Sequence, residues 1–167
     1  NLALLYENGQ GVAQSSKKAA ECYTMAAEQG HVDAMYNLGC MYRDGKGVEK
    51  SFKKAAEFFT MAAKKGKLAS AMYNLALLHE DGKGVVQSFK KAFELYTMAA
   101  AQGFGSATYN LGCLYRDGEG VVQSFKKTAE LWTMAAEQGH VKAMSNLGLQ
   151  YIRGQGVDQS NELAREW

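Results

Sequence analysis

Residues 42–48 read "YRDGKGV", and the same seven positions recur in five places along the chain. The other copies are YENGQGV at 6–12, HEDGKGV at 79–85, YRDGEGV at 115–121 and YIRGQGV at 151–157. One copy alone resembles a phosphate-binding loop, because a lysine stands between two glycines. The lysine is present in only two of the five copies, whereas both glycines are present in all of them. The repetition therefore favours a structural turn over a nucleotide site.

The position of the glycine pair supports the same interpretation. A phosphate loop follows a strand and opens its helix at once, whereas this loop lies between two helical patterns. Gly45 and Gly47 are expected to end the first helix in a left-handed conformation and to permit a tight reversal. Val48 is expected to fold back between the helices.

The chain is built from repeats of nearly constant length. The pair Asn-Leu begins at 1, 37, 74, 110 and 146, so the spacings are 36, 37, 36 and 36 residues. The one additional residue lies in "KKGKLASAM" at 64–72, in the connection between two repeats. A fixed period of this size is typical of a solenoid of helical hairpins.

Each repeat contains two helical patterns. In the second repeat the first helix is expected over 33–42, with Ala34, Leu38 and Met41 on one face. The second helix is expected over 51–66. Ser51 is its predicted N-cap and Gly66 its predicted C-terminal stop. The same roles fall to the equivalent residues Ser15, Ser88, Ser124 and Ser160, and to Gly30, Gly103 and Gly139.

The motif residues of the second repeat are Ala34, Leu38, Gly39, Tyr42, Gly45, Gly47, Val48, Lys54, Ala55, Phe58, Phe59, Ala62, Ala63 and Gly66. This pattern resembles the Sel-1-like repeat family, which is related to tetratricopeptide repeats. The resemblance implies an all-α, right-handed α-solenoid of antiparallel helix pairs with about 36 residues per repeat. First helices would line its concave face. The expected units are a partial first repeat at 1–30, repeats at 31–66, 67–103 and 104–139, and a partial last repeat at 140–167, within a longer array.

The resemblance also implies a function. Such a chain would be a non-catalytic scaffold or adaptor that binds a peptide segment or helix of a partner protein in its concave groove. Two alternatives stay open, namely a regulatory or targeting arm of a larger enzyme and a purely structural spacer. No catalytic residue, metal site or cofactor is expected, because histidine and cysteine show no suitable pairing or spacing.

Composition restricts the partners and the compartment. The net charge of +2 does not favour nucleic acid, and no apolar run is long enough for a membrane helix. The three cysteines, Cys22, Cys40 and Cys113, form no regular pairs, which mildly favours a reducing, cytoplasmic location.

Residues at equivalent positions of successive repeats form columns along a solenoid. We expect partner contacts from an asparagine column and a neighbouring tyrosine column, since amides can bind a peptide backbone and tyrosines make rigid anchors. An alternating-sign column adds two arginines. These candidates are Asn37, Asn74, Asn110, Asn146, Tyr36, Tyr73, Tyr109, Arg43 and Arg116, with Asn1 beginning the first column. The alternative is that the asparagine and tyrosine columns only pack neighbouring helices together and that the charged column forms solvated ion pairs between repeats.

Two further columns are expected to have no binding role. Lysine pairs at 17–18, 53–54, 90–91 and 126–127 are interpreted as a solvated face, with an acidic partner as the alternative. A methionine column is expected to fill space between stacked helices, with an adaptable binding surface as the alternative. Its members are Met25, Met61, Met98 and Met134.

Overall fold

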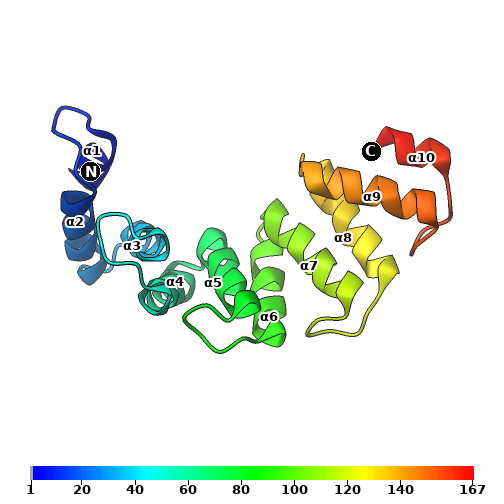
Figure 1. The fold of residues 1–167 in the computed structure, drawn as a ribbon, viewed down its shortest axis with the longest axis horizontal. Coiled ribbons are helices and arrows are strands. Elements are labelled where there is room, and N and C mark those ends of the chain that lie inside the picture. Colours follow the sequence, from blue (N-terminus) through cyan, green and yellow to red (C-terminus); the bar gives the residue numbers. More distant parts are fainter. Residues whose placement is uncertain (1) are drawn as a thin grey trace. The chain divides into compact units, whose positions relative to one another are not determined.

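The computed structural model describes residues 2–167, which form ten helices and no strand (Figure 1). First helices of the repeats alternate with second helices. The first helices are α1 (Leu2–Asn8), α3 (Val32–Asp44), α5 (Ala69–Asp81), α7 (Gly105–Asp117) and α9 (Val141–Arg153). The second helices are α2 (Ser16–Glu28), α4 (Phe52–Gly66), α6 (Phe89–Ala100), α8 (Phe125–Glu137) and α10 (Asn161–Glu166).

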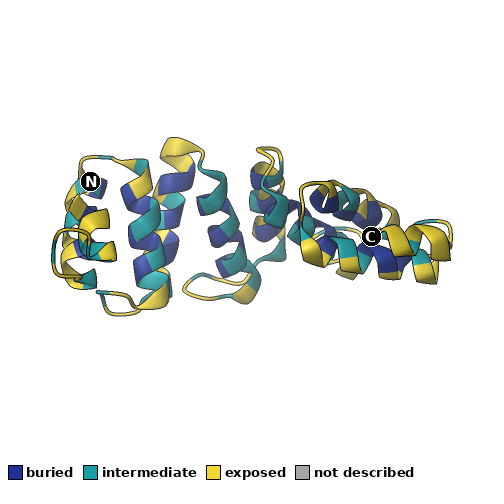
Figure 2. Ribbon diagram, turned by 90° about the horizontal axis from the view of Figure 1, so that it is seen from above, coloured by how far each residue is buried: buried dark blue, intermediate teal, exposed yellow. Residues whose placement is uncertain are grey.

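The helices group into two compact units, Asn1–Gln87 and Ser88–Trp167. In each unit the main contacts join helices that follow one another in the chain: α1 to α5 in the first unit and α6 to α10 in the second. Buried residues lie on the helix sides that face these neighbours, while the loops are largely exposed (Figure 2). This pattern of neighbour contacts confirms the predicted all-α repeat fold.

The second helices begin at serine caps, as the sequence predicts. Ser51 is extended (φ −151°), and its hydroxyl accepts a hydrogen bond from the backbone N–H of Lys54 at 3.3 Å. The bond satisfies one of the N–H groups that the first turn leaves unpaired. The equivalent bond is present at Ser15, Ser88, Ser124 and Ser160.

The glycine pair builds the turn between the two helices. Gly45 ends α3 in the left-handed region (φ 72°), and its N–H donates to the carbonyl of Met41. Gly47 is also left-handed (φ 75°) and lies against the preceding repeat, where an added Cβ would be 2.2 Å from the carbonyl oxygen of Ser16. The first glycine thus serves the turn, and the second serves both the turn and the close contact between repeats. Val48 is half-buried beside them.

The helix α4 ends at Gly66, as the sequence predicts, but the left-handed residue of this connection is not the glycine. Gly30, Gly103 and Gly139 have positive φ angles, but Gly66 is the last helical residue of α4 and the left-handed cap is Lys67 (φ 49°). The additional residue of this connection moves the reversal one position along the chain. Glycine at 66 serves close packing instead, because an added Cβ would lie 2.4 Å from the Val32 side chain.

The methionine column is exposed, so the expectation that it fills space between helices is wrong. Met25, Met61, Met98 and Met134 are 56%, 44%, 51% and 49% exposed. The reason is the position of the methionines around the helix. In α4 the next two residues, Ala62 and Ala63, face the core, and the side chain of Met61 therefore points outwards.

Within residues 2–167, no helix is long and apolar enough to span a membrane.

Candidate functional site

The asparagine column lies at one position of the first helices α3, α5, α7 and α9, while Asn1 lies outside the described residues. Three of the asparagines, Asn74, Asn110 and Asn146, bond a tyrosine hydroxyl of the preceding helix pair. The amide nitrogen of Asn110 donates to the hydroxyl of Tyr96 at 3.0 Å, and that of Asn146 donates to Tyr109 at 2.9 Å. The column therefore links consecutive repeats within each unit.

The source of the hydroxyl changes from repeat to repeat. The hydroxyl of Tyr96, on a second helix, accepts the bond from Asn110, and the Asn37 side chain interacts with Tyr23, the equivalent residue of the first repeat. The equivalent second-helix residues of the other repeats are Phe59 and Trp132, which lack a hydroxyl. There the asparagine turns to a first-helix tyrosine, so that Asn74 reaches Tyr36 at 3.5 Å and Asn146 reaches Tyr109.

First-helix glycines accompany the two aromatic rings that lack a hydroxyl. An added Cβ at Gly39 would be 2.7 Å from the Phe59 ring, and one at Gly112 would be 2.6 Å from the Trp132 ring. Alanine occupies this position, at Ala3 and Ala76, in the repeats whose second helix carries tyrosine. The four repeats thus alternate between two residue combinations, glycine with phenylalanine or tryptophan and alanine with tyrosine. The sequence shows that the first-helix residue and the aromatic residue change together from repeat to repeat. The reason is visible only in the structure, where the glycine and the aromatic ring are in contact.

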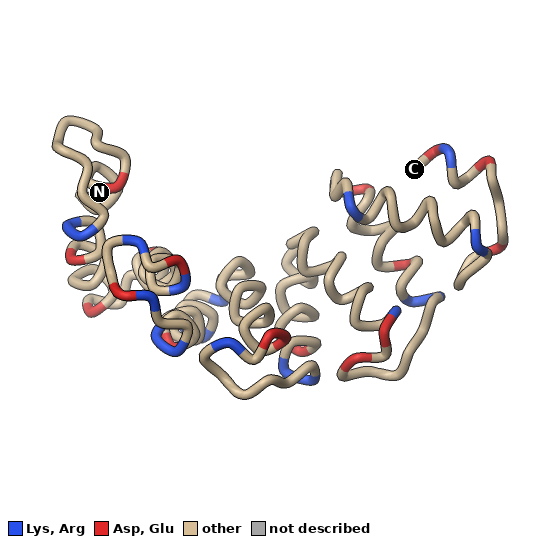
Figure 3. The backbone as a smooth tube through the Cα atoms, in the orientation of Figure 1, with Lys and Arg blue, Asp and Glu red and all other residues tan. Residues whose placement is uncertain are grey.

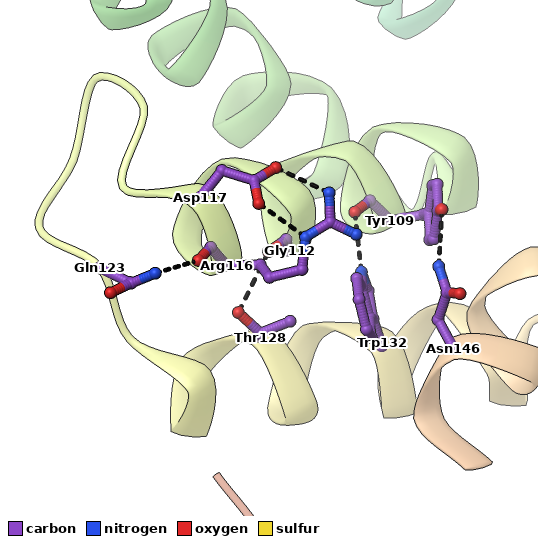
Figure 4. A network of polar contacts seen from close by, with 8 residues as sticks. All are labelled: Tyr109, Gly112, Arg116, Asp117, Gln123, Thr128, Trp132 and Asn146. Atoms are coloured by element: carbon purple, nitrogen blue, oxygen red, sulfur yellow. Dashed lines mark hydrogen bonds and ion pairs between the residues drawn. The ribbon is translucent and has the colours of Figure 1, made fainter. Parts of the chain in front are cut away.

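The arginines lie at the ends of the first helices. Arg116 makes a bidentate ion pair with Asp117, at 2.7 Å for both bonds, and its guanidinium lies 5.6 Å from the centre of the Trp132 ring (Figure 4). Arg43 pairs with Asp44 in the same way and also donates to the amide oxygen of Asn74 at 2.5 Å. The Arg43 guanidinium holds the pKa of the Asp44 carboxyl below its usual range.

The tyrosine column is half-buried. Tyr109 stacks between the rings of Trp132 and His140, at centroid distances of 5.8 and 4.5 Å. Burial raises the pKa of Tyr109 to about 12, with Cys113 adding to the effect, so the phenol is neutral and can both donate and accept. Tyr36 packs 5.9 Å from Phe59.

The four asparagines differ in what they can still bind. Asn74 is 7% exposed, and its amide bonds Ser70, Tyr36 and Arg43. Asn110 and Asn146 are half-buried, and their amide oxygens have no partner among residues 2–167. Both oxygens are therefore unused acceptors.

The candidate residues do not share one pocket. Asn37 borders an open cleft of about 700 Å³ between α1, α2 and α3, together with Leu2, Tyr23, Met25 and His31. In the second unit, Arg116 and Asn146 border a smaller pocket of about 70 Å³. Burial raises the pKa of the thiols of Cys40 and Cys113, which line neither pocket, and the described residues contain no cluster placed to hold a metal ion.

Two interactions of the lysine and loop positions were not predicted. The second lysine of three pairs lies over the last tyrosine of the preceding first helix, at 5.2, 5.0 and 4.9 Å for Lys18–Tyr6, Lys54–Tyr42 and Lys127–Tyr115. Lysine or arginine and aspartate or glutamate lie near the loops (Figure 3). Four loop glutamines donate to carbonyls at the first-helix ends, at 2.6–2.9 Å: Gln14, Gln87, Gln123 and Gln159.

Gln150 in α9 was also missed, although a polar residue in an apolar column was a readable signal. Leu114, Leu78 and Met41 occupy its position in the preceding repeats. Gln150 is 4% exposed, and neither its amide nitrogen nor its amide oxygen has a hydrogen-bond partner in the described structure. It borders the 70 Å³ pocket.

Replacing Gln150 by leucine should raise the free energy of unfolding by about 1–3 kcal/mol, because a buried polar group without a partner carries a cost of that size. Urea unfolding followed by circular dichroism measures the change. The matched control is Leu114→Gln, which places the same amide in the preceding repeat and should destabilise the protein. If Gln150→Leu is less stable than the parent, the amide has a stabilising partner in solution.

The chain matches known repeat proteins over its whole length. The model of the Sel1 repeat matches residues 1–31, 32–67, 69–104, 105–140 and 141–167. A protective antigen of uropathogenic Escherichia coli, c5321, described as displaying an SLR fold, superposes with a TM-score of 0.95 at 32% identity. The alignment covers 99% of this chain and 35% of the antigen.

Two further structures are similar. A Sel1 repeat protein from Oxalobacter formigenes has a TM-score of 0.94 at 30% identity, with 99% of this chain and 68% of that protein covered. The immunity protein Pa5087 of Pseudomonas aeruginosa shares the fold, with a TM-score of 0.58 at 24% identity over 98% of this chain and 62% of its own. Comparison with curated proteins yields no match. With five matched repeats that together span the helix pairs described above, the chain belongs to the Sel1 repeat family.

Proposed function

We propose that this chain is a non-catalytic scaffold that binds an extended peptide segment or a helix of a partner protein along its first helices. Sel1 repeat proteins are generally protein-interaction scaffolds and are typically non-catalytic. The observation that supports a binding role for this face is the pair of unused amide oxygens on Asn110 and Asn146, beside half-buried phenols and guanidinium groups.

The proposed contacts follow from the chemistry of each group. The amide oxygens of Asn110 and Asn146 would accept hydrogen bonds from backbone N–H groups of the partner, and Asn37 would contribute from the 700 Å³ cleft. Tyr36, Tyr73 and Tyr109 would provide aromatic contact area, and Arg43 and Arg116 would orient partner carbonyls or carboxylates. Asn74 would act indirectly, by holding Arg43 and Tyr36 in place.

The test is a binding measurement on a partner identified by affinity capture from cells. The double change Asn110→Ala and Asn146→Ala should weaken that partner's binding by about 1–3 kcal/mol, because each neutral hydrogen bond contributes about 0.5–1.5 kcal/mol. Lys90→Ala with Lys91→Ala, at the start of α6, is the control and should leave the affinity unchanged. Circular dichroism checks that both variants are folded.

The exposed methionines provide the competing surface. If the folded asparagine variant binds the partner at full strength while Met98→Ser with Met134→Ser abolishes binding, the partner docks on the second helices and the proposal is wrong. If no variant of either face affects any partner, the spacer alternative is favoured.

A further inference from the structure

The 70 Å³ pocket of the second unit contains an unsatisfied buried amide. Its lining residues are Arg116, Trp132, Asn146, Leu149, Gln150, Arg153 and Gln155. Gln150 is 4% exposed, yet its nitrogen and its oxygen both lack a partner. Both atoms have almost no accessible surface in the unbound chain, and a carboxamide that turns towards the pocket offers two N–H donors and one acceptor to a ligand there.

The pocket also carries positive charge. Two of its lining residues are arginines and none is acidic. Asp117 neutralises Arg116 through the bidentate pair, whereas Arg153 has no ionic partner among residues 2–167. The other repeats have asparagine or aspartate at the position of Arg153, namely Asn8, Asp44, Asp81 and Asp117. The fifth repeat thus combines an arginine in an acidic column with a glutamine in an apolar column, and both border one pocket.

We propose that this pocket binds the C-terminal carboxylate of a partner polypeptide. The carboxylate oxygens accept hydrogen bonds from the Gln150 amide nitrogen and the Arg153 guanidinium, which forms charge-assisted bonds. The N–H of the terminal residue donates to the Gln150 amide oxygen, so both orphaned atoms are satisfied. In an Asp or Glu side chain the carboxylate lies one or two carbons further from its own backbone N–H, so the C-terminal carboxylate matches the neighbouring donor and acceptor of Gln150 better.

The size of the pocket fits one small group. By the measure in which about 10–15 Å³ holds one water molecule, a pocket of about 70 Å³ has room for a carboxylate and the adjacent N–H. This inference rests on the proposed function and deepens it, because Arg116 and Asn146 belong to both surfaces. It names the chemistry of the partner segment that would end there.

The experiment titrates three probes into the ¹⁵N-labelled chain and follows the side-chain amide signal of Gln150 by NMR. The probes are acetyl-tetraalanine with a free C-terminal carboxylate, the same peptide as its C-terminal amide, and sodium acetate. We expect a saturable shift with the free acid at millimolar concentration and affinities at least about tenfold lower for the other two, since each lacks one element of the contact.

Variants connect the shift to the pocket. Arg153→Ala should lower the affinity for the free-acid peptide at least about tenfold, whereas Arg165→Ala, an exposed arginine of α10 outside the pocket, should not change it. Gln150→Leu should also lose binding, as measured by the shifts of neighbouring backbone amides, while its melting temperature rises.

Four outcomes would overturn the inference. They are equal affinity for the acid and amide peptides, equal affinity for acetate and the acid peptide, full binding by Gln150→Leu, and no shift with any probe up to tens of millimolar. None of these outcomes by itself contradicts the proposed scaffold function, which is tested by a different variant. Loss of partner binding in the Asn110→Ala, Asn146→Ala variant would still support the scaffold role if the peptide probes fail.

Discussion

Leu38→Ala should lower the free energy of unfolding by about 2–5 kcal/mol, the usual range for a leucine truncated in a packed core. Leu38 is 0% exposed, and α3 packs against helices on both sides, α2 and α4. The cavity left by the truncation can close only if those helices move. Urea unfolding monitored by far-UV circular dichroism gives the change directly.

Leu2 is the matched control, because it holds the same repeat position in α1. It is 52% exposed, so Leu2→Ala should cost less than about 1 kcal/mol. The difference between the two substitutions measures what a neighbour on both sides contributes to a repeat. Equal losses at the two positions would contradict the view that each repeat is stabilised by stacking on the next.

Gly47→Ala should also be strongly destabilising, by about 2–5 kcal/mol. Two costs add up at this position. A left-handed backbone costs an alanine about 1–2 kcal/mol, and the new Cβ would lie 2.2 Å from a backbone oxygen at the start of α2, which forces the repeats apart. A backbone atom cannot move aside as a flexible side chain could.

Gly11 separates these two costs. It has nearly the same backbone angle (φ 74°) and occupies the same place in the turn of the first repeat, but an added Cβ there meets nothing within 4 Å. Gly11→Ala should therefore cost only the conformational part, about 1–2 kcal/mol. The unfolding free energies of both variants are measured under identical conditions. If Gly11→Ala is as damaging as Gly47→Ala, the contact between repeats contributes nothing.

The repeat fold could be predicted from the sequence because its determinants are local. Serine before each second helix and glycine after each first helix act within four residues of their own position. At Gly66 the predicted helix end is correct, but the left-handed conformation is not at the glycine, because one additional residue shifts the reversal to Lys67. A column shows which residue is present, not which conformation the chain needs there.

The candidate site was only partly predictable for a related reason. The asparagine and tyrosine columns were visible, but their hydrogen-bond partners depend on whether a ring on another helix carries a hydroxyl. The exposure of the methionines depends on the direction in which their position on the helix points, which the residue type alone does not reveal. Gln150 could have been noticed as an exception in its column, but its lack of partners is a property of the packed structure.

The alternation of aromatic residues also constrains the order in which such repeats can diverge. A repeat with alanine and tyrosine, such as Ala3 with Tyr23, can accept glycine in place of the alanine first, because a smaller residue creates no clash. A repeat that has reached glycine with phenylalanine or tryptophan cannot regain the alanine while the ring still occupies its space, 2.7 Å away at Gly39. Its aromatic residue must change before the glycine does. The asparagine of the next repeat keeps a hydrogen bond at every intermediate step if a first-helix tyrosine lies within reach. Divergence through these steps therefore preserves the hydrogen bond between neighbouring repeats.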